Sequence, residues 1–198
     1  MKLIRKAVSI LTRGSRSILR RIYGFDAWHM STLYEKKYAW DIVHHLNRRP
    51  AVGRTSVFEI GCGLGDIIRR LRFSRRIGYD MDRPALQAAR FLSRFRPNGK
   101  IDFDWFEFPQ TPLAGQADSV IMVNWIHHVP PSVLRMKIEN YFDQNLLPGG
   151  EIIIDTVQDK AYKHNHDIAF LTAGIPATIS RIGQYERQRE IWSIKKAK

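Results

Sequence analysis

Three glycines and three acidic residues have the types and spacing expected of a binding site for a nucleotide-like ligand. The stretch VFEIGCGLGD carries Gly61, Gly63 and Gly65 directly after a short apolar run. Glycines in such a loop let the backbone approach a ligand closely. Acidic side chains stand near the ends of three successive strand-like runs, namely Glu59, Asp80 and Asp104. One such acid alone is commonly a helix cap, but three together favour a bound ligand.

The glycine loop has three candidate ligands: a nicotinamide dinucleotide, a phosphate and S-adenosylmethionine. The spacing of its residues distinguishes among them. A nicotinamide dinucleotide requires Gly-x-Gly-x-x-Gly, but Asp66 occupies the position of the third glycine. A phosphate-binding loop requires Gly-Lys-Ser/Thr, but no lysine occurs between residues 38 and 99. A carboxylate at position 66 would also repel a phosphate from the start of the following helix. Both phosphate-containing ligands are therefore disfavoured.

A cationic nucleoside suits the acidic residues better than a phosphate does. We expect Glu59 to accept hydrogen bonds from loop amides or from an ammonium group. Asp80 lies 19 residues beyond Gly61, where a carboxylate can accept from both hydroxyls of a ribose. Asp104 can accept from an adenine amine, and Trp105 offers an aromatic face for stacking. These roles favour S-adenosylmethionine as the ligand.

Alternating strand-like and helix-like segments must position these residues. Strands are expected over 56–60, 76–80, 100–106, 118–125 and 151–157. Helices are expected from Thr32, which begins a capping box, and over 65–73, 83–95, 131–146 and 163–174. Residues 176–196 read as a hairpin of two strands. This order predicts an α/β fold with a mostly parallel seven-stranded sheet, a C-terminal antiparallel hairpin and helices on both faces.

The segment from about residue 53 to 195 resembles the class I S-adenosylmethionine-dependent methyltransferases, which have a Rossmann-like fold. Five stretches carry the resemblance in order: VFEIGCGLG, GYDMD, DWFEFP, ADSVIMVNWIHHV and LLPGGEIIIDT. The resemblance implies S-adenosyl-L-methionine as the cofactor and methyl transfer as the activity. The cofactor-binding residues that it implies are Glu59, Gly61, Gly63, Gly65, Asp80, Met81, Asp104, Trp105 and Asn124.

The end of the fourth strand faces the methyl group in this family, and here it reads NWIHHV. A histidine, with an ordinary pKa of about 6.5, suits removal of a proton from an acceptor hydroxyl, which favours O-methyl transfer. We expect His127 to be this base in preference to His128, which would cap or pack the next helix. In the alternative, both histidines are structural and positioning of the reactants alone provides catalysis.

Further residues at the same edge of the sheet are expected to bind the acceptor. They are Trp28, His29, Tyr34, Trp125, Asp155, His164 and His166. His164 and His166 stand two residues apart in a predicted helix and would face different sides, so no metal site is expected. The chain lacks the Asn/Asp-Pro-Pro-aromatic tetrad of family members that methylate amino groups on adenine or glutamine. The acceptor is therefore expected to be a small molecule, a lipid-linked molecule or a glycan.

The net charge of +13 indicates an anionic partner or extensively solvated basic faces. Seven of the cations lie in residues 1–25, which contain no acid and place an apolar stripe along one side of a predicted helix. This leader has three interpretations: it binds an anionic membrane, it is an organelle transit peptide, or it packs on its own domain. A second arginine-rich zone covers residues 69–96.

The sequence thus predicts a basic leader helix over 1–25, a covering segment over 26–52 and a methyltransferase domain over 53–198. Two other functions stay open, namely an RNA methyltransferase that uses the arginine-rich helices and a non-catalytic module that kept the fold. The single cysteine suits the cytoplasm, and residues 1–25 would place the protein at the periphery of a membrane if they bind lipid.

Overall fold

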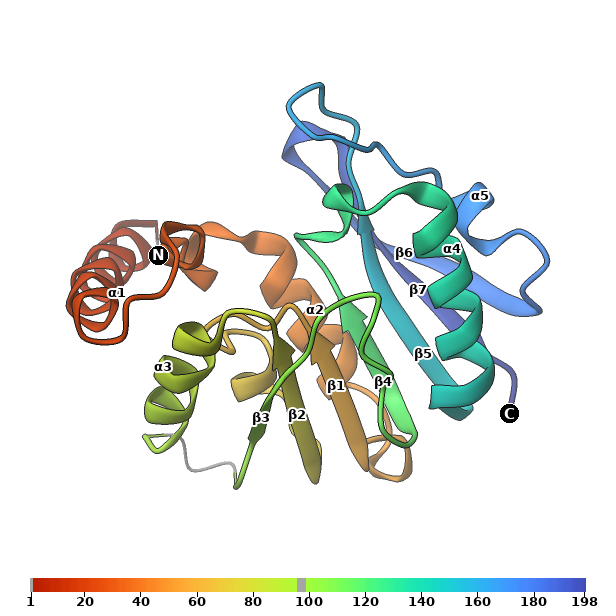
Figure 1. The fold of residues 1–198 in the computed structure, drawn as a ribbon, viewed down its shortest axis with the longest axis horizontal. Helices are drawn as coiled ribbons and strands as arrows, with labels where there is room; N and C mark the ends of the chain where they lie inside the picture. Colours follow the sequence, from red (N-terminus) through yellow and green to blue (C-terminus); the bar gives the residue numbers. More distant parts are fainter. Residues whose placement is uncertain (1, 96–98) are drawn as a thin grey trace.

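The computed structural model describes residues 2–95 and 99–198, with side chains from residue 8 onward. The chain forms one seven-stranded sheet of order β3-β2-β1-β4-β5-β7-β6 (Figure 1). The strands are β1 (Ser56–Ile60), β2 (Arg75–Asp80), β3 (Asp102–Trp105), β4 (Ala117–Met122), β5 (Leu146–Thr156), β6 (Ala177–Tyr185) and β7 (Arg189–Lys196).

The sheet is parallel from β3 through β5, and its last two strands are antiparallel. From β1 the chain builds outward to β3, then crosses to β4 on the other side of β1. This reversal creates a crevice at the carboxyl ends of β1 and β4, which is where open α/β sheets bind their ligands. The predicted Rossmann-like sheet with a C-terminal antiparallel hairpin is confirmed.

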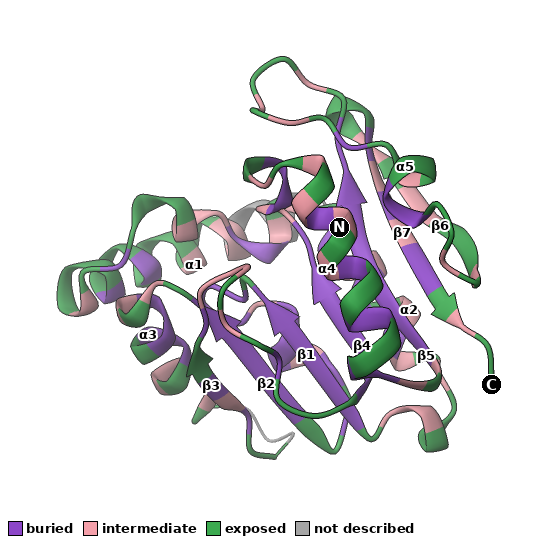
Figure 2. Cartoon of the chain, turned by 45° about the vertical axis from the view of Figure 1, so that its right-hand side comes forward, coloured by how far each residue is buried: buried purple, intermediate pink, exposed green. Residues whose placement is uncertain are grey.

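The α-helices cover both faces of the sheet, and the central strands β1, β2 and β4 are almost wholly buried, whereas the edge strands β3 and β6 are partly exposed (Figure 2). Alternate residues of each strand pack on opposite sides. On one face, Phe58 and Val120 pack in a single apolar cluster with Leu134 of α4 (Pro131–Asn140). On the other, Val57 and Ile121 pack with the side chains of α2. The α-helices are α1 (Lys2–Tyr23), α2 (Lys37–Asn47), α3 (Arg83–Ser93), α4 (Pro131–Asn140) and α5 (Ile168–Thr172).

Two predicted helices are shorter than expected. Residues 65–73 contain only a 3₁₀ turn, Ile68–Arg70. The seven residues 68–74 connect the loop at the cavity to the start of β2. As an α-helix they would span only about 10 Å, whereas they must run back along a strand about 20 Å long. The chain must therefore return in a more extended form. The predicted helix over 163–174 is only α5, because Asp167 caps it by accepting hydrogen bonds from the backbone N–H groups of Ala169 and Phe170.

The segment before the sheet contains short helical turns rather than one helix from Thr32. The predicted capping box is present, with Thr32 and Glu35 bonded reciprocally, but it opens a 3₁₀ turn over Leu33–Glu35. Helix α2 starts only at Lys37. Another 3₁₀ turn, Ala27–Met30, follows α1. Helix α1 lies beside α3 at the outside of the molecule (Figure 1).

Candidate functional site

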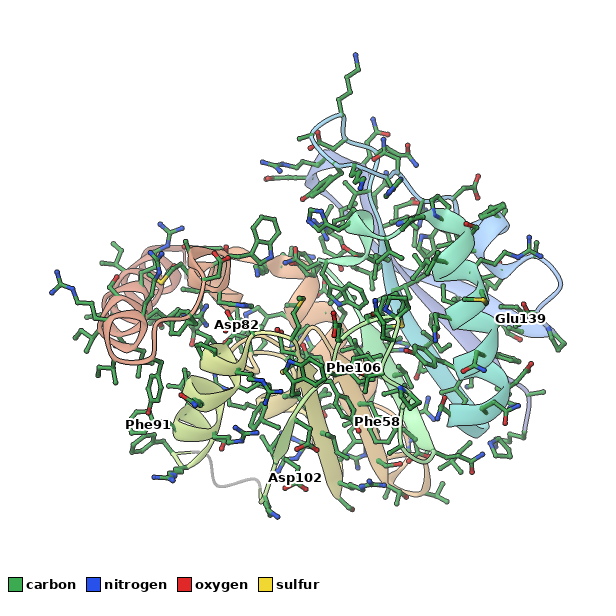
Figure 3. All side chains as sticks on the ribbon, viewed as in Figure 1. Phe58, Asp82, Phe91, Asp102, Phe106 and Glu139 are labelled. Carbon is green, nitrogen blue, oxygen red and sulfur yellow. The ribbon has the colours of Figure 1, made fainter. Side chains whose placement is uncertain are left out.

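A cavity of about 650 Å³ opens where the strand order reverses. Its walls are formed by the glycine loop after β1, the ends of β2 and β4, the segment that follows β3, and residues between 26 and 39. Figure 3 shows Asp82 and Phe106 at this edge of the sheet, whereas Asp102, at the start of β3, lies at the opposite edge. Both Asp82 and Phe106 line the cavity.

The glycine loop needs its glycines for backbone conformation and for close contact. Gly61, Gly63 and Gly65 have φ angles of 75°, 51° and 71°, in the left-handed region that favours glycine. A Cβ atom at Gly61 would overlap the ring of Trp125. A Cβ atom at Gly63 would stand 2.7 Å from Nδ1 of His29. Gly61 and Gly63 line the cavity, but Gly65 does not.

Glu59 is the most deeply buried acid of the cavity wall. Its carboxylate accepts a hydrogen bond from the backbone N–H of Ile68 at 2.9 Å. Burial, with a further contribution from the charges of Asp66 and Asp80, raises the pKa of Glu59 to about 8. Because a cation would relieve this charge repulsion, the position suits a positively charged ligand group.

Asp80 ends β2 and holds the glycine loop in place. Its carboxylate accepts hydrogen bonds from the backbone N–H groups of Gly63, at 2.7 Å, and of Asp82, at 3.0 Å. Asp82 in turn caps α3 through Ala85 and lies 3.2 Å from Nε2 of His29. Met81 lines the mouth of the cavity and is 67% exposed. The sequence analysis did not identify Asp82, although its place before a proline-containing helix start was a signal.

The predicted adenine contacts lie outside the cavity. Asp104 and Trp105 are exposed at the edge strand, and the Arg83 guanidinium stacks on the Trp105 ring at 4.8 Å. The next residue turns inward instead: Phe106 is buried, and its backbone N–H donates to the carbonyl of Asp80. Phe106 and Phe108 supply the aromatic wall. The prediction failed by one residue because β3 has a neighbour on one side only, which leaves its end open to solvent.

Asn124 lies at the end of β4 with a φ angle of 75°, a conformation that asparagine tolerates better than most residues. Its backbone N–H donates to Asp155, and its side-chain oxygen accepts from the hydroxyl of Tyr38 at 3.0 Å. Asn124 and Tyr38 line the cavity. Trp125 also lines it, and its indole N–H donates to the carbonyl of Ile60 at 2.6 Å.

The two adjacent histidines have different environments. His128 lines the cavity, and its ring meets Trp28 edge-on at 6.0 Å. His127 is fully buried behind the wall and packs on Tyr162 at 4.3 Å. Burial, followed by the charge of Arg189, lowers the pKa of His127 to about 3. The expectation that His127 is the base conflicts with this geometry, because an inaccessible neutral imidazole cannot contact the acceptor.

The residues predicted to bind the acceptor separate into two groups. Trp28, His29 and Trp125 line the cavity. Four others do not, namely Tyr34, Asp155, His164 and His166. Asp155 is buried and ion-paired with Arg189, while Nε2 of His166 lies 2.9 Å from the carbonyl of Ile126. Asp155 also accepts a hydrogen bond from the backbone of Asn124 and so supports the cavity wall from behind.

His164 and His166 lie in a loop before α5 and not in the predicted helix. Their two-residue separation therefore does not by itself exclude a shared metal ion. Within residues 2–95 and 99–198, no group of three or more histidine, cysteine, aspartate or glutamate side chains is arranged to hold a metal ion. The sulfhydryl of Cys62 is buried in the loop, where burial raises its pKa well above the ordinary value.

Lys36 is a cavity residue that the sequence analysis missed. Burial lowers the pKa of Lys36, while the nearby carboxylate of Asp66 opposes that shift. Among the side chains that the structure describes, none forms a hydrogen bond or ion pair with the Lys36 ammonium group. An unpaired cation in an otherwise acidic cavity is suited to an anionic group of a ligand. No periodic pattern identifies it, because it stands between two helical turns.

Helix α1 is tied directly to the cavity wall. Arg16, which is 4% exposed, donates to both carboxylate oxygens of Asp66 at 2.7 and 2.6 Å. It also donates to the carbonyls of His29 and Ser31. Burial alone would raise the pKa of Asp66, but the charges of Arg16 and Arg69 lower it below the ordinary value. The leader therefore braces three residues that line the cavity.

Comparison with known proteins identifies the fold. The magnesium protoporphyrin IX methyltransferase of Synechocystis PCC 6803, solved with bound S-adenosylmethionine, has 17% identity and a TM-score of 0.66, covering 98% of this chain and 97% of its own. The N-methyltransferase NodS of Bradyrhizobium japonicum WM9, solved with S-adenosyl-l-homocysteine, has 16% identity and a TM-score of 0.66, covering 84% and 89%.

A methyltransferase of Methanosarcina mazei has 15% identity and a TM-score of 0.58, covering 79% of this chain and 97% of its own. No protein-family model matches the sequence, and a search of curated proteins found no match. The chain therefore has the fold of the class I S-adenosylmethionine-dependent methyltransferases.

Proposed function

We propose that this cavity binds S-adenosylmethionine and that the protein transfers the methyl group to an acceptor held beside His128. The observation that carries the proposal is the convergence of the glycine loop, Glu59 and Asp80 on one cavity at the point where the strand order reverses. The structural neighbours solved with S-adenosylmethionine or its demethylated product support the same ligand.

The residues present fit this cofactor. Glu59 offers a buried carboxyl group to a cation, and Asp80 offers a carboxylate oriented by loop amides to ribose hydroxyls. Phe106 and Phe108 offer aromatic faces to the base. S-adenosylmethionine supplies a methyl group already activated by its sulfonium, so the protein mainly has to hold a nucleophile in line and exclude water.

The other end of the cavity is assigned to the acceptor. His128 is placed to remove a proton from an acceptor hydroxyl, which favours O-methyl transfer. Trp28, whose ring contacts His128, and Trp125 offer aromatic surface to the acceptor at the same cavity. The unpaired Lys36 favours an acceptor with an acidic group. Since one cavity of about 650 Å³ must hold cofactor and acceptor group together, the acceptor is proposed to be a small molecule, a lipid-linked molecule or a glycan.

Two measurements test the proposal in sequence. Titration calorimetry should show binding of S-adenosylhomocysteine and none of NAD, and tight NAD binding would reject the proposed cofactor. Incubation of the protein and labelled S-adenosylmethionine with separate lipid, glycan and small-metabolite extracts should then transfer label to one fraction. Asp80→Asn, which should bind the cofactor more weakly, serves as the control with reduced transfer. Cofactor binding without transfer to any fraction would instead favour a non-catalytic module.

A further inference from the structure

Helix α1 carries a row of apolar side chains that the fold leaves in solvent. Leu11, Ile18 and Ile22 are 72%, 63% and 67% exposed. Their separations of seven and four residues place them along one side of the helix. Single exposed apolar residues are ordinary on protein surfaces, but a row of three large ones on one helix marks an interaction surface. We call these three residues the outer stripe of α1.

The orientation of the outer stripe is set by contacts on the other side of the helix. Arg16 and Leu19 are 4% and 7% exposed and face the domain. Arg16 reaches Asp66, and Leu19 packs with Leu64 in a small apolar cluster. Arg16 and Ile18 are two residues apart, so they project from nearly opposite sides of α1. The same ion pair that docks the helix on the domain therefore turns the outer stripe away from it.

Charge on α1 identifies the occupant of this surface. The helix contains no acidic residue, and Arg21, three residues beyond Ile18, lies exposed beside the stripe in the last turn. An apolar stripe with a cation beside it, on a helix without acids, matches the interface of a bilayer that contains anionic lipids. A second copy of the chain would bring like charges together, and a nucleic acid would leave the apolar stripe in water. None of the described helices is long and apolar enough to cross a membrane. Because the outer stripe runs along the length of α1, a docked helix would lie in the interface plane.

We propose that the outer stripe of α1 docks the protein on the surface of an anionic bilayer. Because Arg16 spans from α1 to Asp66, His29 and Ser31, the docked helix separates the cavity wall from the lipid by about one helix diameter, ~10 Å. The docking does not depend on the proposed function. Only its consequence, that the acceptor is a membrane-bound amphipathic molecule, rests on that function.

Vesicle co-sedimentation of the full chain tests the docking. The protein should pellet with vesicles of phosphatidylcholine mixed with phosphatidylglycerol and stay in solution with phosphatidylcholine alone. Binding should fall as salt shortens the Debye length from about 10 Å at 0.1 M to about 3 Å at 1 M. Ile18→Glu should reduce the vesicle-bound fraction about tenfold, because it puts a charge into the apolar layer.

Ser17→Glu is the matched control, since it makes the same change in charge one residue away on another exposed side of α1. It should retain most of the binding. Both variants should keep the melting temperature and the S-adenosylhomocysteine affinity of the wild type, because both sites are exposed.

Three results would overturn the docking: no pelleting of the wild type with anionic vesicles, equal loss in Ile18→Glu and Ser17→Glu, or a dimer in light scattering that Ile18→Glu dissociates without any vesicle binding. Each leaves cofactor binding measurable, so the two proposals fail separately.

Discussion

The two ends of the cavity are built in different ways. At the glycine-loop end, carboxylates already have partners: Asp80 accepts from two backbone amides, and Glu59 accepts from a third. The side chains of Lys36 and His128 line the same cavity, are proposed to hold the acceptor, and have no hydrogen-bond partner among the described residues. The first set of groups is organised before any ligand arrives, and the second consists of groups whose partners must come from a ligand. The difference supports the proposal that the first set binds the cofactor and the second set the acceptor.

The largest expected effect separates the two histidines at the acceptor end. His128→Ala should lower methyl transfer about 10²–10⁴-fold, because it removes the proton acceptor from the cavity, and cofactor affinity should stay unchanged. Initial rates against pH, with the acceptor identified from the extracts, measure this. His127→Ala should instead lower the melting temperature and leave the pH dependence of the rate in place. Equal activity of wild type and His128→Ala would leave positioning as the only catalytic effect.

Gly61→Ala should damage the cofactor end most. Its methyl group would overlap Trp125, and its φ angle of 75° is unfavourable for alanine. The left-handed conformation alone costs about 1–2 kcal/mol. Urea unfolding should show a loss of at least this size, together with weaker S-adenosylhomocysteine binding. Gly14→Ala is the control, because nothing lies within 4 Å of its Cβ position and it stands inside α1, where alanine is favoured. Equal stability of the two variants would contradict the close contact.

Asp80→Asn should weaken cofactor binding and also lower stability, because asparagine has one acceptor oxygen for the two backbone N–H groups of Gly63 and Asp82. The charge-assisted hydrogen bonds to a ribose are lost as well, at about 1.5–3 kcal/mol. Titration calorimetry should therefore show a roughly 10–100-fold larger dissociation constant. An unchanged constant would place the ribose at another residue and remove the main argument for a pre-organised end.

The last prediction concerns an effect that is spread over several pH units, the pH dependence of stability. The pKa of Glu59 rises from 4.5 to about 8 on folding, so between these values the folded protein binds a proton that the unfolded chain has released. The free energy of unfolding should therefore decrease as pH rises through this window, by at most about 1.4 kcal/mol per pH unit. Glu59→Gln should flatten the profile in urea titrations at several pH values. A slope equal to that of the wild type would mean that Glu59 is ionised in the folded protein.

Prediction from the sequence succeeded for features that depend on neighbouring residues. The order of strands and helices, the C-terminal hairpin and the position of the glycine loop follow from local patterns, because alternation, turn residues and apolar runs are properties of neighbouring residues. Asp80 lies at a strand end that the sequence marks directly. Asp104 and Trp105, which were expected to contact the adenine, lie outside the cavity, and the next residue, Phe106, lines it instead. A shift of one residue along an edge strand decides which side chain faces the cavity.

The sequence by itself determined the fold class and the place of a nucleotide-like site, because strand ends and glycine loops are local. Only the tertiary structure decided which of two adjacent histidines faces the cavity, since a one-residue step in a tight turn directs one inward and the other behind the wall. It also brought the hydroxyl of Tyr38 to Asn124, more than 80 residues further along the chain, and placed Lys36 in the wall of the same cavity. Packing between distant segments, which no local pattern encodes, set those positions.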